Sequence, residues 1–335
     1  MKKTWRKILA AAVALAVVAG LGVAGWRMHQ LHPRDIPVLM YHNVLDGDGL
    51  SVWQVTAEEF AWQMDQLREA GYTTILPEDI ARAAKGWGWM PRKPVVVTFD
   101  DGYEGVKTFA EPILAERGMK GICYVIVGRI AGEGEERASF DSGPLMSTNE
   151  VAAMGARGVV AIGSHSMSHA RGNPRQLGSE IRPSRRELRR LTGIKTRSYC
   201  YPYGLHGYDY MYDALYQGHY TTALACGDEM FHYGTDTNLM AIPRLSVYGG
   251  RHAIKLKSMD AAGGMVVLEN KGAKIPLRVV VKDEASGREW NSDLQWVEGD
   301  SVPFRFPAEA LTGARRIEAW DKAGLFRYLG VEHAP

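Results

Sequence analysis

The sequence predicts an α/β fold, an irregular (β/α) barrel, preceded by a hydrophobic helix and followed by a small all-β module. Three observations lead to this prediction. Segments that are apolar on both faces alternate with amphipathic helices between residues 36 and 250, which is typical of a parallel sheet covered on both sides. Acidic residues and histidines follow several of these segments, at the strand ends where a barrel collects its chemistry. After Leu256, short strands separated by turn residues replace the helical patterns.

Residues 1–30 are expected to form a membrane anchor or a cleaved signal peptide. The uncharged stretch from Ile8 to Gly25 has 18 residues and follows four basic residues, Lys2, Lys3, Arg6 and Lys7. Its length lies between that of a signal-peptide core and the ~20 residues of a spanning helix. Because basic residues keep their end in the cytoplasm, the sequence predicts export. The rest of the chain is either anchored and faces the periplasm or cell exterior, or it is secreted after cleavage.

Residues 31–256 are expected to form the barrel. Its strands are predicted at 36–41, 95–99, 122–127, 159–162, 197–201, 220–225 and 239–247. Capping boxes at Thr56 and Ser147 predict helix starts, another helix follows Gly102 as far as Gly118, and a basic helix is expected at about 183–191. A doubly wound sheet is the alternative arrangement. No Gly-rich phosphate loop follows a strand, so a nucleotide site is not expected.

Residues 257–335 are expected to form a small β-sandwich-like module. Its strands are predicted at 265–269, 276–281, 289–294, 302–306, 316–320 and 326–329. Turn sequences at 283–287 and 321–324 predict hairpins.

Charge and cysteine content exclude some classes of function. The 40 basic and 38 acidic residues give a net charge of +2, too balanced for a nucleic-acid-binding protein on charge alone. The cysteines, Cys123, Cys200 and Cys226, contain no Cys-x-x-Cys pair, and we expect them to be small apolar fillers. Export would permit one disulfide, but the spacing indicates no pairing.

Two pairs of residues at predicted strand ends carry the candidate chemistry. Asp100 and Asp101 follow one strand, and their side chains diverge, so that one can face a metal and the other a reacting water. His165 and His169, after another strand, are four residues apart and can share a metal if that segment is helical. Each pair alone is ordinary. Together, Asp101, His165 and His169 match the three-ligand, open-position site of a hydrolytic metal centre.

Two further residues are predicted at the same end of the barrel. His42 closes the first strand and would project towards this site, although a core or capping histidine is the structural alternative. Tyr203 lies in a Tyr-Pro-Tyr-Gly segment at the end of a later strand. Its backbone N–H is a candidate donor to an oxyanion, and a plain proline turn is the alternative.

These motifs resemble a known family. Thr98-Phe-Asp-Asp-Gly-Tyr103, Gly163-Ser-His-Ser-x-x-His169 and Tyr201-Pro-Tyr-Gly204 occur in that order, and together they resemble the polysaccharide deacetylases with a NodB-homology domain, carbohydrate esterase family four. The opening Pro37-Val-Leu-Met-Tyr-His42 resembles the subgroup that acts on poly-N-acetylglucosamine of biofilms. The resemblance covers about residues 36–250.

The resemblance implies an activity and a role for each residue. It implies a divalent metal, usually zinc, held by Asp101, His165 and His169, with Asp100 as general base. His42 would be the general acid, and the Tyr203 backbone would help to bind the oxyanion. The implied reaction is hydrolysis of N-acetyl groups on an exported polysaccharide, with poly-β-1,6-N-acetylglucosamine favoured over peptidoglycan or chitin-like chains.

The sequence departs from the family pattern in one place. Many members have an arginine two residues before the proline of the third motif, and here that position is Cys200. Arg197 is not assumed to replace it, so the support of Asp100 is undefined. No late histidine motif is found, and His232 and His252 are the candidates if His42 fails.

Other readings stay open from the sequence. A serine hydrolase would use Ser164, Ser166 or Ser168, but no Gly-x-Ser-x-Gly elbow is present. A degenerate barrel would bind glycan without catalysis. In the module, the tryptophans are expected to build the core, with stacking on sugar rings as the alternative; they are Trp290, Trp296 and Trp320.

Overall fold

The computed structural model describes most of the chain after residue 33. The described residues are 34–47, 53–132, 134–141, 143–234, 237–249, 253–313 and 315–333, with 5, 12–13, 15–23, 25–26 and 32. Much of the predicted anchor or signal segment, its basic residues included, therefore lies outside them. Within the described part of the chain, no helix is long and apolar enough to cross a bilayer.

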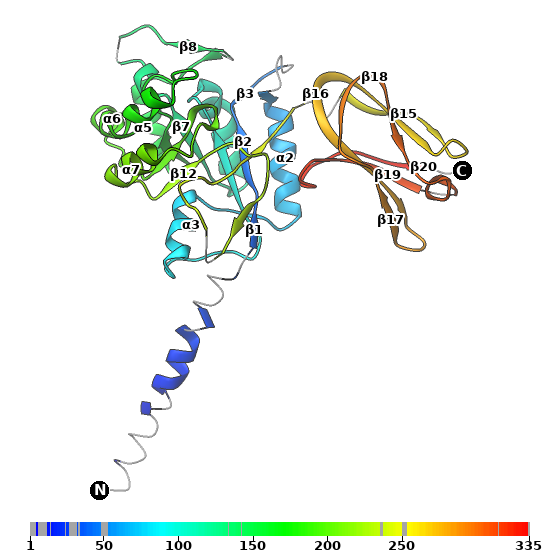
Figure 1. Cartoon of the computed structure of the whole chain (residues 1–335), viewed down its shortest axis with the longest axis horizontal. Helices are drawn as coiled ribbons and strands as arrows, with labels where there is room; N and C mark the ends of the chain where they lie inside the picture. Colours follow the sequence, from blue (N-terminus) through cyan, green and yellow to red (C-terminus); the bar gives the residue numbers. More distant parts are fainter. Residues whose placement is uncertain are drawn as a thin grey trace.

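A curled parallel sheet forms the centre of the first domain (Figure 1). Its strands follow the order β12-β11-β10-β7-β6-β2-β14, with β5 paired to β6, and every pairing is parallel. The strand bounds are β2 Val38–Tyr41, β5 Thr73–Thr74, β6 Pro94–Phe99, β7 Gly121–Val125, β10 Val160–Ser164, β11 Ser198–Cys200, β12 Thr222–Leu224 and β14 Leu245–Ser246. The predicted barrel is thus realised as a half-barrel, and a single parallel bridge between Leu224 and Ile242 brings its edges together.

Helices cover the outside of this sheet. They are α2 Ala57–Glu69, α3 Pro77–Ala84, a π-helix Val106–Ala110 continued by α4 Glu111–Glu116, α5 Thr148–Arg157, α6 Pro174–Thr192 and α7 Asp209–Gln217. The predicted starts are confirmed, because the Thr56 side chain accepts from Glu59 N and Ser147 forms a full capping box with Glu150.

One helix differs from the prediction of 183–191. Helix α6 begins nine residues earlier, at Pro174, after the Asn173 side chain caps it by accepting from Gln176 N. Pro183 therefore lies inside the helix rather than at its start. Proline is equally typical of a first turn, which is why the sequence pattern indicated the wrong one.

Short strands decorate the sheet. β1 Arg34–Ile36 pairs antiparallel with β13 Phe231–Tyr233, β3 Asn43–Leu45 pairs parallel with β4 Gln54–Thr56, and β8 Ser139–Phe140 pairs with β9 Gly143–Pro144. Strand β3, the first of the β3–β4 pair, begins directly after His42.

The C-terminal residues form a separate antiparallel β module (Figure 1). Its strands are β15 Ile254–Asp260, β16 Met265–Asp283, β17 Arg288–Asn291, β18 Gln295–Arg305, β19 Arg315–Asp321 and β20 Arg327–His333, with a 3-10 turn at Ala308–Leu311. All six belong to one sheet, and β16 joins two predicted strands into one that shifts register near Asn270. The hydrophobic core of the module includes Leu268, Val279, Phe304 and Ile317.

The module packs against α2 of the first domain. The Trp62 ring lies 5.6 Å from that of Tyr328 and 6.3 Å from that of Phe326, and Arg327 N donates to Gln66 Oε1 at 3.1 Å. Tyr328 Oη also donates to the Tyr248 carbonyl oxygen, so the module lies beside the sheet edge formed by β14.

Candidate active site

Two adjacent aspartates leave the end of β6 in different directions. Asp101 has a φ of 70°, in the left-handed region, which turns its side chain away from that of Asp100. The next residue, Gly102, also has a positive φ, and a Cβ there would lie 3.0 Å from Val125 Cγ1. The Asp-Asp-Gly sequence is therefore required by a tight turn that presents two carboxylates separately.

Asp101, His165 and His169 come together as the sequence predicts. Asp101 Oδ1 lies 3.6 Å from His165 Nε2 and 3.5 Å from His169 Nε2, and one ligand atom from each residue lies within 4.8 Å of the others. All three residues are buried. The histidine pair does not share a helix. His169 has a φ of 56°, and the turn that positions it is closed by a hydrogen bond from His169 N to Ser166 Oγ.

Hydrogen bonds orient both imidazoles with Nε2 towards Asp101. His165 Nδ1 lies 2.9 Å from the Cys200 carbonyl oxygen, which only accepts, so Nδ1 carries the proton and Nε2 presents a lone pair. His169 Nδ1 lies 3.1 Å from the Tyr203 hydroxyl, which can hold it in the same tautomer. Burial lowers the pKa of both histidines, that of His169 to about 3, so both are neutral. Neutral, oriented imidazoles are the form that binds metals.

The unpartnered oxygen of Asp101 fits a cation. Asp101 Oδ1 is buried and has no hydrogen-bond partner, an arrangement that costs free energy unless something binds there. Burial, followed by repulsion from Asp100, raises the pKa of Asp101 to about 8. One carboxylate and two imidazoles are a donor set suited to zinc and related divalent ions. These residues therefore fit the divalent metal that the family implies.

Asp100 is held by an arginine that the sequence motifs did not indicate. Arg244 Nη1 donates to Asp100 Oδ1 and Nη2 donates to Oδ2, both at 2.7 Å. The guanidinium also donates through Nε to the Ala225 carbonyl oxygen and through Nη1 to Thr98 Oγ1. Burial alone would raise the pKa of Asp100, but attraction and hydrogen bonds from Arg244 lower it well below its usual value. Asp100 is thus an ionised carboxylate fixed in one orientation.

Arg244 had a signal in the sequence. It lies immediately before β14, inside the apolar segment 239–247 that was predicted as a strand. A charged residue in such a segment has to find a partner when it is buried. Arg197, which is closer in sequence to the Tyr-Pro-Tyr-Gly motif than Arg244 is, is exposed and does not hold Asp100.

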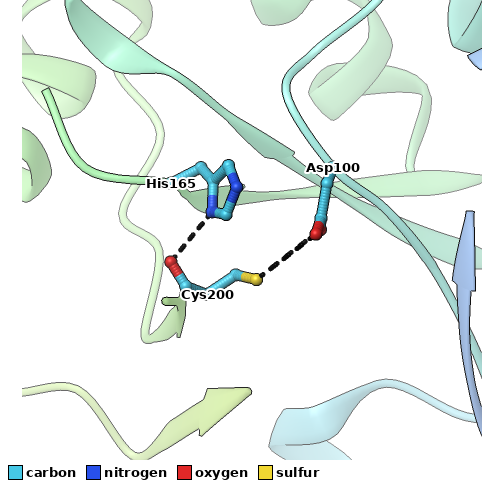
Figure 2. A group of neighbouring side chains, drawn as sticks. All are labelled: Asp100, His165 and Cys200. Carbon is cyan, nitrogen blue, oxygen red and sulfur yellow. Dashed lines mark hydrogen bonds between the residues drawn. The ribbon is translucent and has the colours of Figure 1, made fainter. Parts of the chain in front are cut away.

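Cys200 contacts both His165 and Asp100 (Figure 2). Its backbone carbonyl oxygen accepts from His165 Nδ1, and its thiol lies 3.5 Å from Asp100 Oδ1. Cys200 is buried on β11 within a hydrophobic cluster, as expected of an apolar filler, and in addition its carbonyl and thiol contact the site. All three cysteines are free thiols.

His42 is placed within the electrostatic reach of the site. Its ring packs on Trp53 at a centroid distance of 4.9 Å. Burial lowers the pKa of His42 to about 4; the charge of Asp100 favours the protonated form, and Arg244 and His165 oppose it. The alternative candidate His232 lies on β13 with an exposed side chain hydrogen-bonded to Asp35. His252 lies outside the described residues.

Tyr203 approaches the site through its side chain. Its ring lies 4.5 Å from that of His169, and its φ of 57° places the residue in the left-handed region. The predicted oxyanion contact of its backbone N–H stays a prediction.

The candidate serine nucleophiles are engaged in hydrogen bonds with groups other than a histidine ring. Ser164 Oγ donates to Ser184 Oγ at 2.7 Å, and Ser168 Oγ donates to Glu180 Oε1 at 2.6 Å. Ser166 Oγ accepts from His169 N. A serine hydrolase needs its hydroxyl beside a base, so this arrangement speaks against that alternative.

Comparison with known sequences connects the site to a family. Residues 88–221 match the model of the family described as polysaccharide deacetylase. The chain is 29% identical over 175 residues to YxkH of Bacillus subtilis strain 168, a protein named as a polysaccharide deacetylase; the match covers 51% of this chain and 58% of YxkH. It is 46% identical over 57 residues to the poly-β-1,6-N-acetyl-D-glucosamine N-deacetylase of Escherichia coli K12, covering 17% of this chain and 8% of that enzyme.

Solved structures show the same fold. IcaB from Ammonifex degensii superimposes with a TM-score of 0.54 at 25% identity, covering 64% of this chain and 91% of IcaB. The deacetylase PplD of Streptococcus pyogenes superimposes with a TM-score of 0.55 at 21% identity, over 64% of this chain and 93% of PplD. The half-barrel of this chain therefore carries a polysaccharide deacetylase domain, and the match to YxkH spans about half of each protein.

Proposed function

We propose that this chain is a metal-dependent hydrolase that removes N-acetyl groups from an exported polysaccharide containing N-acetylglucosamine. The observation that carries the proposal is that a three-residue candidate metal site and an ionised carboxylate lie together at the carboxyl ends of the strands. One carboxylate oxygen of Asp101 and one ring nitrogen each of His165 and His169 lie within 4.8 Å of one another. Asp100, the preceding residue of the same turn, is ionised and is held in place by Arg244. A Lewis acid beside a base is the arrangement that amide hydrolysis requires.

Zinc is the favoured metal, and Asp101, His165 and His169 would hold it. When bound, it would polarise the acetamide carbonyl and make water a better nucleophile at neutral pH. The Cys200 carbonyl and the Tyr203 hydroxyl keep the two histidines oriented for it.

The protein's own groups supply the proton transfers. Asp100, kept ionised by Arg244, accepts a proton from the attacking water. His42 donates a proton to the departing amine, which leaves poorly as an anion. Burial lowers the pKa of His42 to about 4 even though the nearby Asp100 favours the charged form, so His42 is neutral in the free protein and takes up from solvent, as the substrate binds, the proton that it then donates. The Tyr203 backbone N–H is proposed to stabilise the oxyanion.

Poly-β-1,6-N-acetylglucosamine is the favoured substrate. The Pro37–His42 motif and the partial similarity to the Escherichia coli enzyme support this choice. Peptidoglycan and chitin-like chains are the alternatives. The basic and apolar N-terminal segment supports a location outside the cytoplasm, either anchored in the membrane or secreted.

Acetate release from defined oligosaccharides tests the proposal. The protein is incubated with β-1,6-linked and β-1,4-linked N-acetylglucosamine oligomers and with peptidoglycan fragments, before and after treatment with a chelator. We expect acetate from the β-1,6 series, loss of the activity on chelation, and its return on adding zinc. Binding of these glycans without any acetate release would favour a non-catalytic glycan-binding protein instead. Release from another series would correct the substrate and keep the reaction.

A further inference from the structure

A row of aromatic side chains runs from His42 of the candidate active site to the β module. The His42 ring lies 4.9 Å from that of Trp53, the Trp53 ring lies 6.4 Å from that of Tyr248, and the Tyr248 ring lies 5.8 Å from that of Trp296. Each step is within the range of direct ring contact. We call these four residues the aromatic row.

The aromatic row begins at the catalytic end of the sheet. His42 directly follows β2, and its charge state is coupled to that of Asp100. Trp53 is brought beside it by the β3–β4 pairing, with Asn43 N donating to the Trp53 carbonyl oxygen. Tyr248 follows β14 after the segment that contains Arg244. The first three members are therefore positioned by β2 and β14 of the central sheet and by the β3–β4 pair.

The aromatic row ends on the β module, outside its core. Trp296 lies on β18, opposite Pro276 of β16, and is 51% exposed. The other two tryptophans of the module are Trp290 and Trp320. Both are half-buried and are covered by arginine side chains. The expectation that all three tryptophans build the core is thus wrong for Trp296.

Both tryptophans of the aromatic row, Trp53 and Trp296, expose a large part of their side chains to solvent. Trp53 is 41% exposed, and exposed aromatic surface in a continuous path usually marks a binding site. A pyranose ring has an apolar C–H face and a polar rim. An aromatic ring with polar groups at its edge matches both. Lys274 Nζ lies 5.8 Å above the Trp296 ring and 3.6 Å from Glu298 Oε2, so charged groups flank the last ring.

We propose that the aromatic row is a binding track for the sugar units that flank the reacting N-acetyl group, and that the β module thereby forms part of the polysaccharide site. This inference rests on the proposed function. Glycan is the one occupant that suits it, because the row is continuous with a site for an N-acetylated sugar and a polymer offers a ring to each aromatic member in turn. The track gives the module a role: it makes the enzyme prefer long chains.

Chain-length dependence tests the track. The full-length protein and its variants are assayed on a disaccharide and an octasaccharide of N-acetylglucosamine, in both β-1,6 and β-1,4 series. In Trp296→Ala, we expect the ratio of kcat/KM for the octasaccharide to that for the disaccharide to fall about three- to tenfold, the loss of one ring stack. The change should lie in KM for the octasaccharide, and Trp296→Tyr should restore most of it.

The matched control is another exposed tryptophan. Trp89 is 62% exposed and precedes β6, at the amino end of the sheet and opposite the site. Trp89→Ala should keep the wild-type ratio. Equal ratios in Trp296→Ala, Trp89→Ala and wild type would overturn the track.

Calorimetric binding separates this failure from failure of the proposed function. Octasaccharide binding should weaken about three- to tenfold in Trp296→Ala, whether or not acetate is released. If wild type binds the octasaccharide without releasing acetate, the proposed function fails and the affinities of the variants still decide the track. No difference between Trp296→Ala and Trp89→Ala, or no binding by wild type, overturns it.

Discussion

Two buried carboxyl groups, one in the β module and one in the half-barrel, differ in whether nearby cations compensate their charge. In the β module, Glu318 is 2% exposed, accepts from Trp320 Nε1, and pairs with cations of Lys282, Arg316 and Arg327 at 3.0–3.1 Å. In the half-barrel, Asp101 is 4% exposed, has an unpartnered Oδ1 and lies next to a second aspartate. The module neutralises its buried acid, whereas the half-barrel leaves one that needs a cation.

Backbone strain follows the same division. Among the residues that the structure describes, the non-glycine residues with positive φ all lie in the half-barrel: Asp101, Ser166, His169, Tyr203, His219 and Asp228. Three of them, Asp101, His169 and Tyr203, belong to the candidate metal-dependent site. Backbone strain and uncompensated charge near the carboxyl ends of the strands are typical of a functional site, where the side chains must hold a specific geometry at a cost in stability.

The largest effect is expected from removing the base. Asp100→Asn keeps the size of the side chain but cannot accept the proton of water. Acetate release should fall about 10²- to 10⁴-fold, while the bound metal, measured by elemental analysis, stays at the wild-type level. Wild-type turnover in this variant would show that Asp100 is not the base.

The second effect concerns the arginine under the base. Arg244→Ala leaves Asp100 buried and ionised without a partner, which should lower the free energy of unfolding by about 3–5 kcal/mol. Denaturant titration measures it, with the exposed Arg197→Ala as the control. Arg244→Lys should recover part of the stability but not the activity, because an ammonium group cannot hold both carboxylate oxygens. Full activity in Arg244→Lys would contradict a positioning role.

The third effect lies in the module. Glu318→Gln removes the shared partner of three cations and should lower the free energy of unfolding by about 1–3 kcal/mol. Although burial raises the pKa of Glu318, hydrogen bonds from Trp320, Lys282 and Arg327 lower it overall. Its stabilisation is therefore present above the unfolded-state pKa of ~4.3 and is lost as pH falls below that value. The variant should show a flatter acid limb than wild type.

Its control is the neighbouring Glu289→Gln. Glu289 also pairs with Lys282 but is 49% exposed. It should change stability by less than about 1 kcal/mol. Acetate release from the disaccharide by either module variant should match wild type, and a loss would mean that the module acts on the chemistry itself.

The smallest effect has the opposite sign. In metal-free protein, Asp101→Asn should raise the free energy of unfolding by about 1 kcal/mol, because it removes a buried carboxyl group that the charge of Asp100 disfavours, and because asparagine tolerates positive φ. Thermal unfolding in the presence of chelator measures it, and Asp100→Asn, which strips Arg244 of its partner, should do the reverse. Equal destabilisation by Asp101→Asn and Asp100→Asn would contradict the difference drawn here between an unpaired and an arginine-paired aspartate.

The sequence indicated the three proposed metal ligands but not the residue that holds the proposed base. Asp101, His165 and His169 could be predicted because a parallel sheet brings strand ends together and each residue lies in a local motif. Arg244 could not be assigned, since its partner is 144 residues away and only the three-dimensional fold pairs them. The start of α6 and the continuity of β16 were missed for a related reason. Proline and turn residues indicate several boundaries equally well, and packing selects among them.

Metal content tests the central claim most directly. The full-length protein, purified and freed of loosely bound ions, should carry one divalent metal per chain, with the same content in Asp100→Asn and essentially none in His165→Ala. Equal metal in wild type and His165→Ala, or none in a wild-type protein that still releases acetate, would contradict the assignment of Asp101, His165 and His169 as its ligands.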